Sequence, residues 1–199
     1  MKFFSRQVLF IVVVIVLVIY LLVLFCRPKN LTRSDSITLA KNLTSSEQKS
    51  TVGLPLRLKI PVIRVDAVVE DVGLTSAGAM ESPSGPATTA WFKLGVRPGE
   101  FGSAVIAGHF GTWKTGQGSV FDNLHNIKIG DQITVIDDKG VTINFIVREI
   151  KSFASDADSS SIFYSADGKS HLNLITCEGE WNKITKSYPD RLVIFADRE

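Results

Sequence analysis

The chain has 199 residues, with 22 Lys and Arg against 20 Asp and Glu, and a formal net charge of +2. A balance this close to neutral gives no basic surface of the kind that nucleic acids require. The two cysteines, Cys26 and Cys177, lie in segments of very different character, which excludes an intramolecular disulfide framework.

An uncharged stretch, Val8 to Phe25, consists almost entirely of Val, Ile and Leu. As a helix it is roughly 27 Å long, close to the hydrocarbon thickness of a bilayer. A cleaved signal peptide needs a shorter apolar core and a small-residue cleavage site, whereas Phe25-Cys26-Arg27-Pro28 follows here. The bulky Phe25 also disfavours lipidation of Cys26. We therefore predict that residues 1–26 are a retained single-pass membrane anchor.

Positive charges flank the apolar stretch on both sides, so charge does not set its orientation. A hydrophobic segment this close to the N-terminus usually acts as a signal-anchor that leaves the C-terminal part outside the cell. We expect the protein in the cell membrane with its C-terminal domain on the extracellular face.

Residues 27–53 are rich in Ser, Thr, Lys and Asn and have no sustained periodicity, which predicts a flexible linker. Residues 54–199 are a common size for one domain with one core.

This domain reads as all-β, because its apolar runs are short, β-branched and bounded by turn residues. The predicted strands are Leu56–Ile60, Ala67–Val72, Ser103–Ala107, Gln132–Asp137, Thr142–Ser152, Leu172–Thr176 and Leu192–Ala196. Asp138-Lys139-Gly140 predicts a hairpin turn, Ser119–Leu124 a short helix or irregular turn, and Ser155–Phe163 a segment of caps and loops. So many strands in one domain imply a closed barrel or a sandwich.

Three reactive side chains stand at the ends of predicted strands: His109, Cys177 and Arg191. A thiol nucleophile, a histidine that carries protons and a fixed cation for the oxyanion are the parts of a thiol acyl-transfer site. Strand alternation places Leu172, Leu174 and Thr176 on one face, so Cys177 points to the opposite face.

Each of the three residues also has an ordinary interpretation: a buried structural cysteine, a surface histidine, an arginine that solvates a strand start. Gly108 and Gly111 around His109 leave room for close backbone approach, which favours a site. His171 lies roughly 20 Å from Cys177 along its strand, too far to act as the base. His125 looks like part of a solvated turn. Glu178 and Glu180 are expected to be solvated or to take part in substrate approach.

Taken together, the motifs resemble the sortases, the membrane-anchored cysteine transpeptidases of bacterial surfaces. They are Arg57–Pro61 with Val65–Ala67, Gly73-Leu74, Gly78–Pro83, Ala90–Phe92, Pro98-Gly99, Ala107–His109, Val120–Leu124 with Gly130-Asp131, Leu174–Cys177 and Arg191–Ala196. The early motifs look most like the class E/F type. Residues 111–118 depart from the pattern as an insertion after the histidine, which affects substrate preference.

The resemblance implies a closed sortase-type β-barrel with short helices in which His109, Cys177 and Arg191 are catalytic. Cys177 would attack the threonine carbonyl of a sorting signal resembling Leu-Pro-x-Thr-Gly, with Thr176 and Glu178 in contact with the substrate. The partners would be surface proteins that carry such a signal and an amine from a peptidoglycan precursor or a pilin lysine. No cofactor is expected; no acidic cluster has calcium-ligand spacing, and calcium dependence stays open.

Other classes fit less well. L,D-transpeptidases expect Ser-x-Gly-Cys where this chain has Ile175-Thr176-Cys177-Glu178-Gly179, and papain-like proteases place the cysteine before the histidine. An exported adhesion or scaffold domain without turnover is the non-enzymatic alternative.

Overall fold

The computed structural model describes residue 20 and residues 52–113 and 115–199. The predicted anchor, apart from Tyr20, and most of the predicted linker lie outside this part of the chain, as does Cys26. Among the described residues, no helix is long and apolar enough to cross a membrane. The anchor and its orientation stay predictions.

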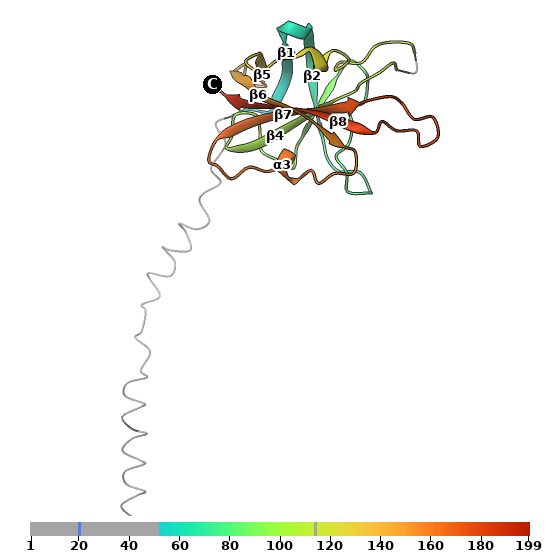
Figure 1. The fold of residues 1–199 in the computed structure, drawn as a ribbon. Coiled ribbons are helices and arrows are strands. Elements are labelled where there is room, and N and C mark those ends of the chain that lie inside the picture. Colours follow the sequence, from blue (N-terminus) through green and yellow to red (C-terminus); the bar gives the residue numbers. More distant parts are fainter. Residues whose placement is uncertain (1–19, 21–51, 114) are drawn as a thin grey trace, which may run out of the picture. The chain divides into compact units, whose positions relative to one another are not determined.

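Eight strands form a closed barrel in the order β1-β2-β3-β4-β7-β8-β6-β5 (Figure 1). They are β1 (Pro55–Ile60), β2 (Val65–Val72), β3 (Thr89–Phe92), β4 (Gly102–Gly108), β5 (Gln132–Asp137), β6 (Thr142–Ala154), β7 (Ser170–Glu178) and β8 (Asp190–Arg198). Three one-turn helices interrupt the connections: η1 (Pro61–Ile63), η2 (Leu124–Asn126) and α3 (Ser160–Phe163). The expectation of a closed barrel with short helices is confirmed, and the sandwich is excluded.

Alternation along the strands fills the barrel interior with one continuous apolar core. Leu172 and Leu174 of β7 and Ile194 of β8 are fully buried in it, together with Phe121 from the turn after β4. Thr176 shares the inward face of β7 and is also buried. The prediction that Cys177 faces away from the core is confirmed, because the leucines of its strand point inward.

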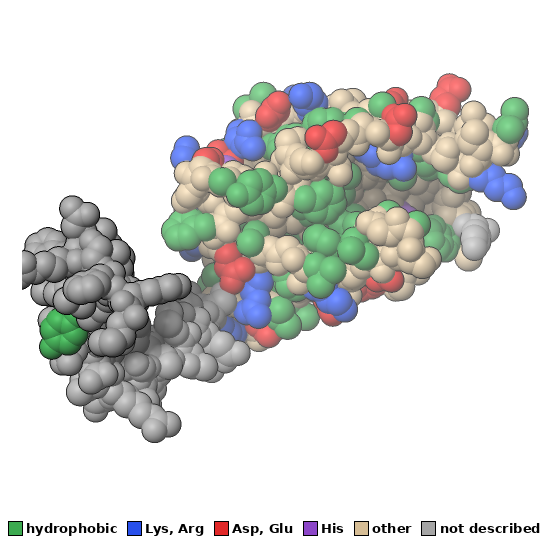
Figure 2. All heavy atoms as spheres, turned by 90° about the horizontal axis from the view of Figure 1, so that it is seen from below, with side chains coloured by type: hydrophobic (Ala, Val, Ile, Leu, Met, Phe, Trp, Pro, Cys, Tyr) green, Lys and Arg blue, Asp and Glu red, His purple; other side chains and the backbone are tan. Residues whose placement is uncertain are grey.

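A second, smaller apolar cluster covers the outer face of β4, β7 and β8. Val105, Val193 and Phe195 supply the strand side, and Ile162 of α3 packs on them. Asn173 of β7 donates from Nδ2 to the carbonyl of Ile162 at 2.6 Å, which ties α3 to the sheet. Figure 2 looks at the domain from below the view of Figure 1, and hydrophobic side chains gather across this face.

The predicted bounds hold for β5, and the other six predicted strands extend one or two residues further at one end or both. Strand β3 was not predicted, since it is only four residues long and its first three side chains are buried, so it shows no alternation. Strand β7 extends two residues further at each end than predicted, because Ser170 and His171 are buried despite their polarity. The turn at 138–140 is confirmed, with Gly140 at φ 77°. Ser119–Leu124 is an irregular turn that leads into η2.

The barrel already includes the end of the predicted linker. The N–H of Gly53 donates to Asp137 Oδ2 at 2.8 Å, and Val52 packs against the core. The barrel falls within one compact unit that begins at Ser50.

Candidate active site

Cys177 is the penultimate residue of β7, half-buried and free of any disulfide. Its direct partner across the antiparallel β7–β8 ladder is Arg191. Burial raises the pKa of the Cys177 thiol, and the nearby Arg191 charge offsets only part of this increase. The resting site therefore holds mainly the thiol, and a base is needed to form the thiolate that attacks a carbonyl.

His109 directly follows β4, which runs parallel to β7 with Ala107 opposite Ile175. This register carries both chains to the same end of the sheet, so His109 and Cys177 emerge side by side. The Thr176 hydroxyl donates to the Gly108 carbonyl at 2.8 Å and fixes the two strand ends to each other. A side chain at position 108 would meet the Phe121 ring at 2.3 Å, which explains the glycine before the histidine.

The His109 imidazole is held on two sides. Its Nε2–H donates to the carbonyl of Pro83 at 2.9 Å, and the Trp113 ring lies against it with centroids 4.7 Å apart. Trp113 comes from the 111–118 segment that departs from the sortase pattern, so this segment supplies part of the wall of the histidine site.

Arg191 lies inside β8, not before the strand as predicted, because β8 begins at Asp190. Its Nη1 donates to the carbonyls of Asp190 at 2.8 Å and Tyr188 at 3.2 Å. The other guanidinium N–H groups make no hydrogen bond to any described residue, which leaves them available to an oxyanion or substrate carbonyl.

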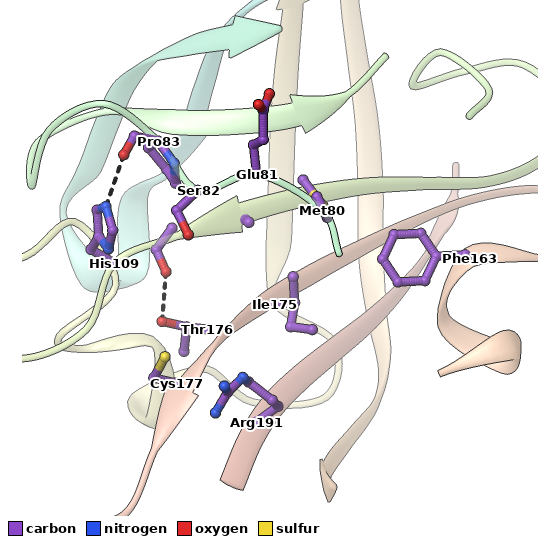
Figure 3. A pocket seen from close by; sticks show the side chains of 12 residues that line it. Met80, Glu81, Ser82, Pro83, His109, Phe163, Ile175, Thr176, Cys177 and Arg191 are labelled. Atoms are coloured by element: carbon purple, nitrogen blue, oxygen red, sulfur yellow. Dashed lines mark hydrogen bonds between the residues drawn. The ribbon is translucent and has the colours of Figure 1, made fainter. Parts of the chain in front are cut away.

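One cavity of about 150 Å³, which we call the central cavity, brings these residues together (Figure 3). Its lining includes His109, Thr176, Cys177 and Arg191, with Met80, Glu81, Ser82, Pro83, Ala107, Gly108, Phe163 and Ile175. In Figure 3 the Cys177 sulfur lies between Thr176 and the guanidinium of Arg191, with His109 on the far side of Thr176. The Cys177 thiol makes no hydrogen bond to His109 or to any other described residue, as is common in unliganded sites.

Two further cavities meet at Cys177. A groove of about 560 Å³ extends from Cys177 and Arg191 over the α3 face, between apolar side chains that include Met80, Phe92 and Phe163. A smaller cavity of about 130 Å³ also reaches Cys177, and Thr176, Glu178 and His125 line it. Of the predicted substrate-contact pair, Thr176 lines both the central and the smaller cavity, whereas Glu178 lines only the smaller one.

His171 is placed as expected, away from all three cavities. It is buried, with Nδ1 2.6 Å from Asp197 Oδ1 and Nε2 3.0 Å from Asp167 Oδ1. His125 is exposed, but it lines the smaller cavity together with Cys177, which the sequence did not suggest.

Tyr188 is a site residue that the sequence reasoning missed. Its ring packs edge-on against Phe110 and Trp181, and a side chain at Gly111 would meet its hydroxyl at 2.1 Å. Burial first, and then the nearby Cys177 and Asp122, raise the pKa of its phenol. Tyr188 thus joins the segment before Arg191 to the segment after His109, and its position three residues before Arg191 was the one available signal.

Within the described ranges, no group of three or more His, Cys, Asp or Glu could hold a metal ion. The chemistry that the cavity offers is thiol-dependent acyl transfer.

The model of the sortase domain matches residues 58–199. The chain belongs to the sortase family. Sortases are transpeptidases, so the enzyme class expected from the sequence is supported at the level of the family. A search of curated protein sequences finds no match.

Solved sortases have the same fold. The sortase D5 transpeptidase of Clostridium perfringens is 21% identical, with a TM-score of 0.54 over 73% of this chain and 78% of that chain. Sortase C-1 of Actinomyces oris is 23% identical, with a TM-score of 0.58 over 72% of each chain. A lid mutant of Corynebacterium diphtheriae sortase A is 22% identical, with a TM-score of 0.57 over 77% of this chain and 74% of that chain. The three names span three sortase types, so the class E/F resemblance of this sortase stays a prediction.

Proposed function

We propose that this sortase is a cysteine transpeptidase that cleaves a sorting signal resembling Leu-Pro-x-Thr-Gly between Thr and Gly and transfers the acyl group to an amine. The observation that carries the proposal is that His109, Cys177 and Arg191 line one cavity. A non-catalytic scaffold would have no need to bring a thiol, an imidazole and a guanidinium to the same cavity.

In the first half-reaction His109 takes the proton of the Cys177 thiol, the resulting thiolate attacks the threonine carbonyl, and a tetrahedral oxyanion forms. The free N–H groups of Arg191, with the backbone N–H after the nucleophile, stabilise this charge. The C–N bond then breaks, His109 gives its proton to the leaving glycine amine, and a thioester to Cys177 remains.

In the second half-reaction an incoming amine gives its proton to His109 and attacks the thioester, and the new amide releases Cys177. Water in place of the amine gives slow hydrolysis. The acceptor that we propose is an amine of a peptidoglycan precursor or a pilin lysine, and the donor is a surface protein that carries the sorting signal.

The groove along the α3 face supports an extended apolar donor peptide. It begins at Cys177 and Arg191 and continues between Met80, Phe92 and Phe163. Apolar walls of this kind suit the Leu-Pro part of a sorting signal, while the cut bond lies over Cys177.

Mass spectrometry of the full-length protein with a panel of Leu-Pro-x-Thr-Gly peptides and candidate amines tests the proposal. We expect an acyl-enzyme whose mass equals the protein plus the peptide up to threonine, less one water, and a transfer product once an amine is added. The Cys177→Ala variant is the matched control. The absence of acyl-enzyme and transfer with every peptide, both with and without calcium, would reject the function.

We also propose that residues 1–26 anchor the enzyme with its barrel outside the cell, where its substrates would be. External protease on spheroplasts should then release the barrel by cutting between Arg27 and Gly53. A mature N-terminus after Cys26 would contradict the anchor, and a barrel protected from the protease would contradict the orientation.

A further inference from the structure

The hydrogen bond that His109 makes decides which of its nitrogens can exchange a proton. Its Nε2 lies 2.9 Å from the carbonyl of Pro83, and a carbonyl oxygen only accepts hydrogen bonds. Nε2 therefore carries a proton, and Nδ1 is the nitrogen left to give and take protons during a reaction. The position of one backbone carbonyl thus sets both the tautomer and the orientation of the imidazole.

The Pro83 carbonyl belongs to a loop without regular structure, between β2 and β3. A carboxylate from β2 holds this loop: Glu70 Oε2 accepts the N–H of Ser84 at 2.9 Å, and Oε1 accepts its hydroxyl at 2.7 Å. The loop is held a second time where the carbonyl of Pro86 accepts the N–H of Val120 at 2.7 Å. Pro83 itself is buried.

Glu70 is ionised under ordinary conditions. Burial acts to raise the pKa of its carboxyl, but hydrogen bonds from Thr88 and Ser84, with the charge of His109, outweigh burial and lower the pKa overall. The titratable groups that line the central cavity with His109 are Glu81, Cys177 and Arg191, and Glu70 does not line this cavity.

We infer that Glu70 is a positioning residue for His109, which acts through Ser84 and the Pro83 carbonyl to keep Nε2 protonated and Nδ1 free for proton exchange. Its effect on turnover rests on the proposed function, whereas its effect on the tautomer does not. In this arrangement the Pro83 carbonyl orients the catalytic base His109, and the Glu70 carboxylate holds that carbonyl in place.

Selective ¹⁵N labelling of histidine in the full-length protein tests the tautomer, because three histidines give three signals to assign. We expect the wild-type His109 signal to show the Nε2–H form at a pH where it is neutral. In Glu70→Ala this signal should shift towards a mixture of tautomers, while the His125 and His171 signals stay unchanged. Glu70→Gln should give a smaller shift, since its amide oxygen can still accept from Ser84.

Kinetics on the same proteins supplies the second measurement. Glu70→Ala should lower kcat about 10-fold with KM within about twofold, because a misplaced imidazole slows proton transfer. Combining it with Ser84→Ala should add little, since both act through one contact. The control is Asp71→Asn, which removes an exposed carboxylate from the neighbouring position of β2 that pairs with Lys93. It should change neither measurement.

An unchanged His109 tautomer in Glu70→Ala overturns the inference, even if kcat falls, because the loss would then have another structural cause. The same changes in Asp71→Asn also overturn it. If the wild type transfers no peptide, the proposed function fails, and the tautomer measurement alone decides the role of Glu70.

Discussion

The two ends of β7 carry polar residues under opposite conditions. At the N-terminal end, His171 is buried between Asp167 and Asp197, and Arg148 donates to the same Asp197 oxygen at 2.7 Å. At the C-terminal end, the Cys177 thiol has no hydrogen-bond partner among the described residues and meets three cavities. Where a buried histidine is paired with carboxylates, a strand end adds stability; where a thiol nucleophile is left unpaired beside a cation, it can bind and react.

Of these substitutions, Cys177→Ala should have the largest effect, because it removes the reactive group from the C-terminal end of β7. We expect it to reduce transfer by at least about 10⁴-fold, because no other nucleophile is proposed at the site. The free energy of unfolding should change little, since the thiol makes no hydrogen bond to the described residues. Mass spectrometry measures the transfer of the peptide, and denaturant unfolding measures the stability. Transfer above a trace level in the variant would show that Cys177 is not the nucleophile.

The same substitution at His109 and at His171 should have opposite effects: the first should reduce activity and the second should reduce stability. His109→Ala should lower kcat by roughly 10²–10⁴-fold through loss of the acid and base, with stability nearly unchanged. His171→Ala should cost about 2 kcal/mol of unfolding free energy, because Asp167 and Asp197 each lose a hydrogen bond to the buried ring. Its activity per folded molecule should stay within about twofold.

His125→Ala is the third member of this series, since His125 lines the smaller cavity beside Cys177. A small effect would confirm His109 as the proton carrier. If His125→Ala or His171→Ala lowers kcat as much as His109→Ala, the assignment of His109 is wrong.

Arg191→Lys should have the next largest effect. The planar guanidinium keeps Nη1 on two backbone carbonyls and still has N–H groups for the oxyanion. Lysine cannot do both, so we expect an acylation rate about 10²-fold lower. Labelling of Cys177 by a small thiol reagent should be largely retained, because it needs no oxyanion. Turnover near the wild-type rate would make Arg191 a structural residue.

The sequence predicts those features of the site that depend on neighbouring residues in the chain, and it does not predict those that depend on contacts between distant segments. The alternation in Leu172–Thr176 predicts the direction of Cys177, because that depends only on the strand itself. The contacts of Tyr188, and of Glu70 with Ser84, join segments that are distant in the chain or separated by an irregular loop, and no periodicity marks them. Strand β3 is also hard to predict, since its four residues show no alternation and it is a strand because it pairs with β2 and β4.

The smallest expected effect concerns acid stability at the His171 end. The hydrogen bond from His171 first, and then the N–H of Lys169, hold the pKa of Asp167 well below its ordinary value. Because the folded pKa is lower than the unfolded value, ionised Asp167 stabilises the fold at every pH above about 4. This contribution decreases as the pH falls below that value towards the folded pKa.

Asp167→Asn should therefore be less stable than the wild type at neutral pH and should lose less stability between about pH 4 and pH 2. Denaturant midpoints across this range measure the difference, with Asp156→Asn, an exposed carboxylate of the same connection, as the control. Parallel pH curves for wild type and Asp167→Asn would show that the polar end of β7 does not depend on this carboxylate, and the contrast with the Cys177 end would then rest on Asp197 alone.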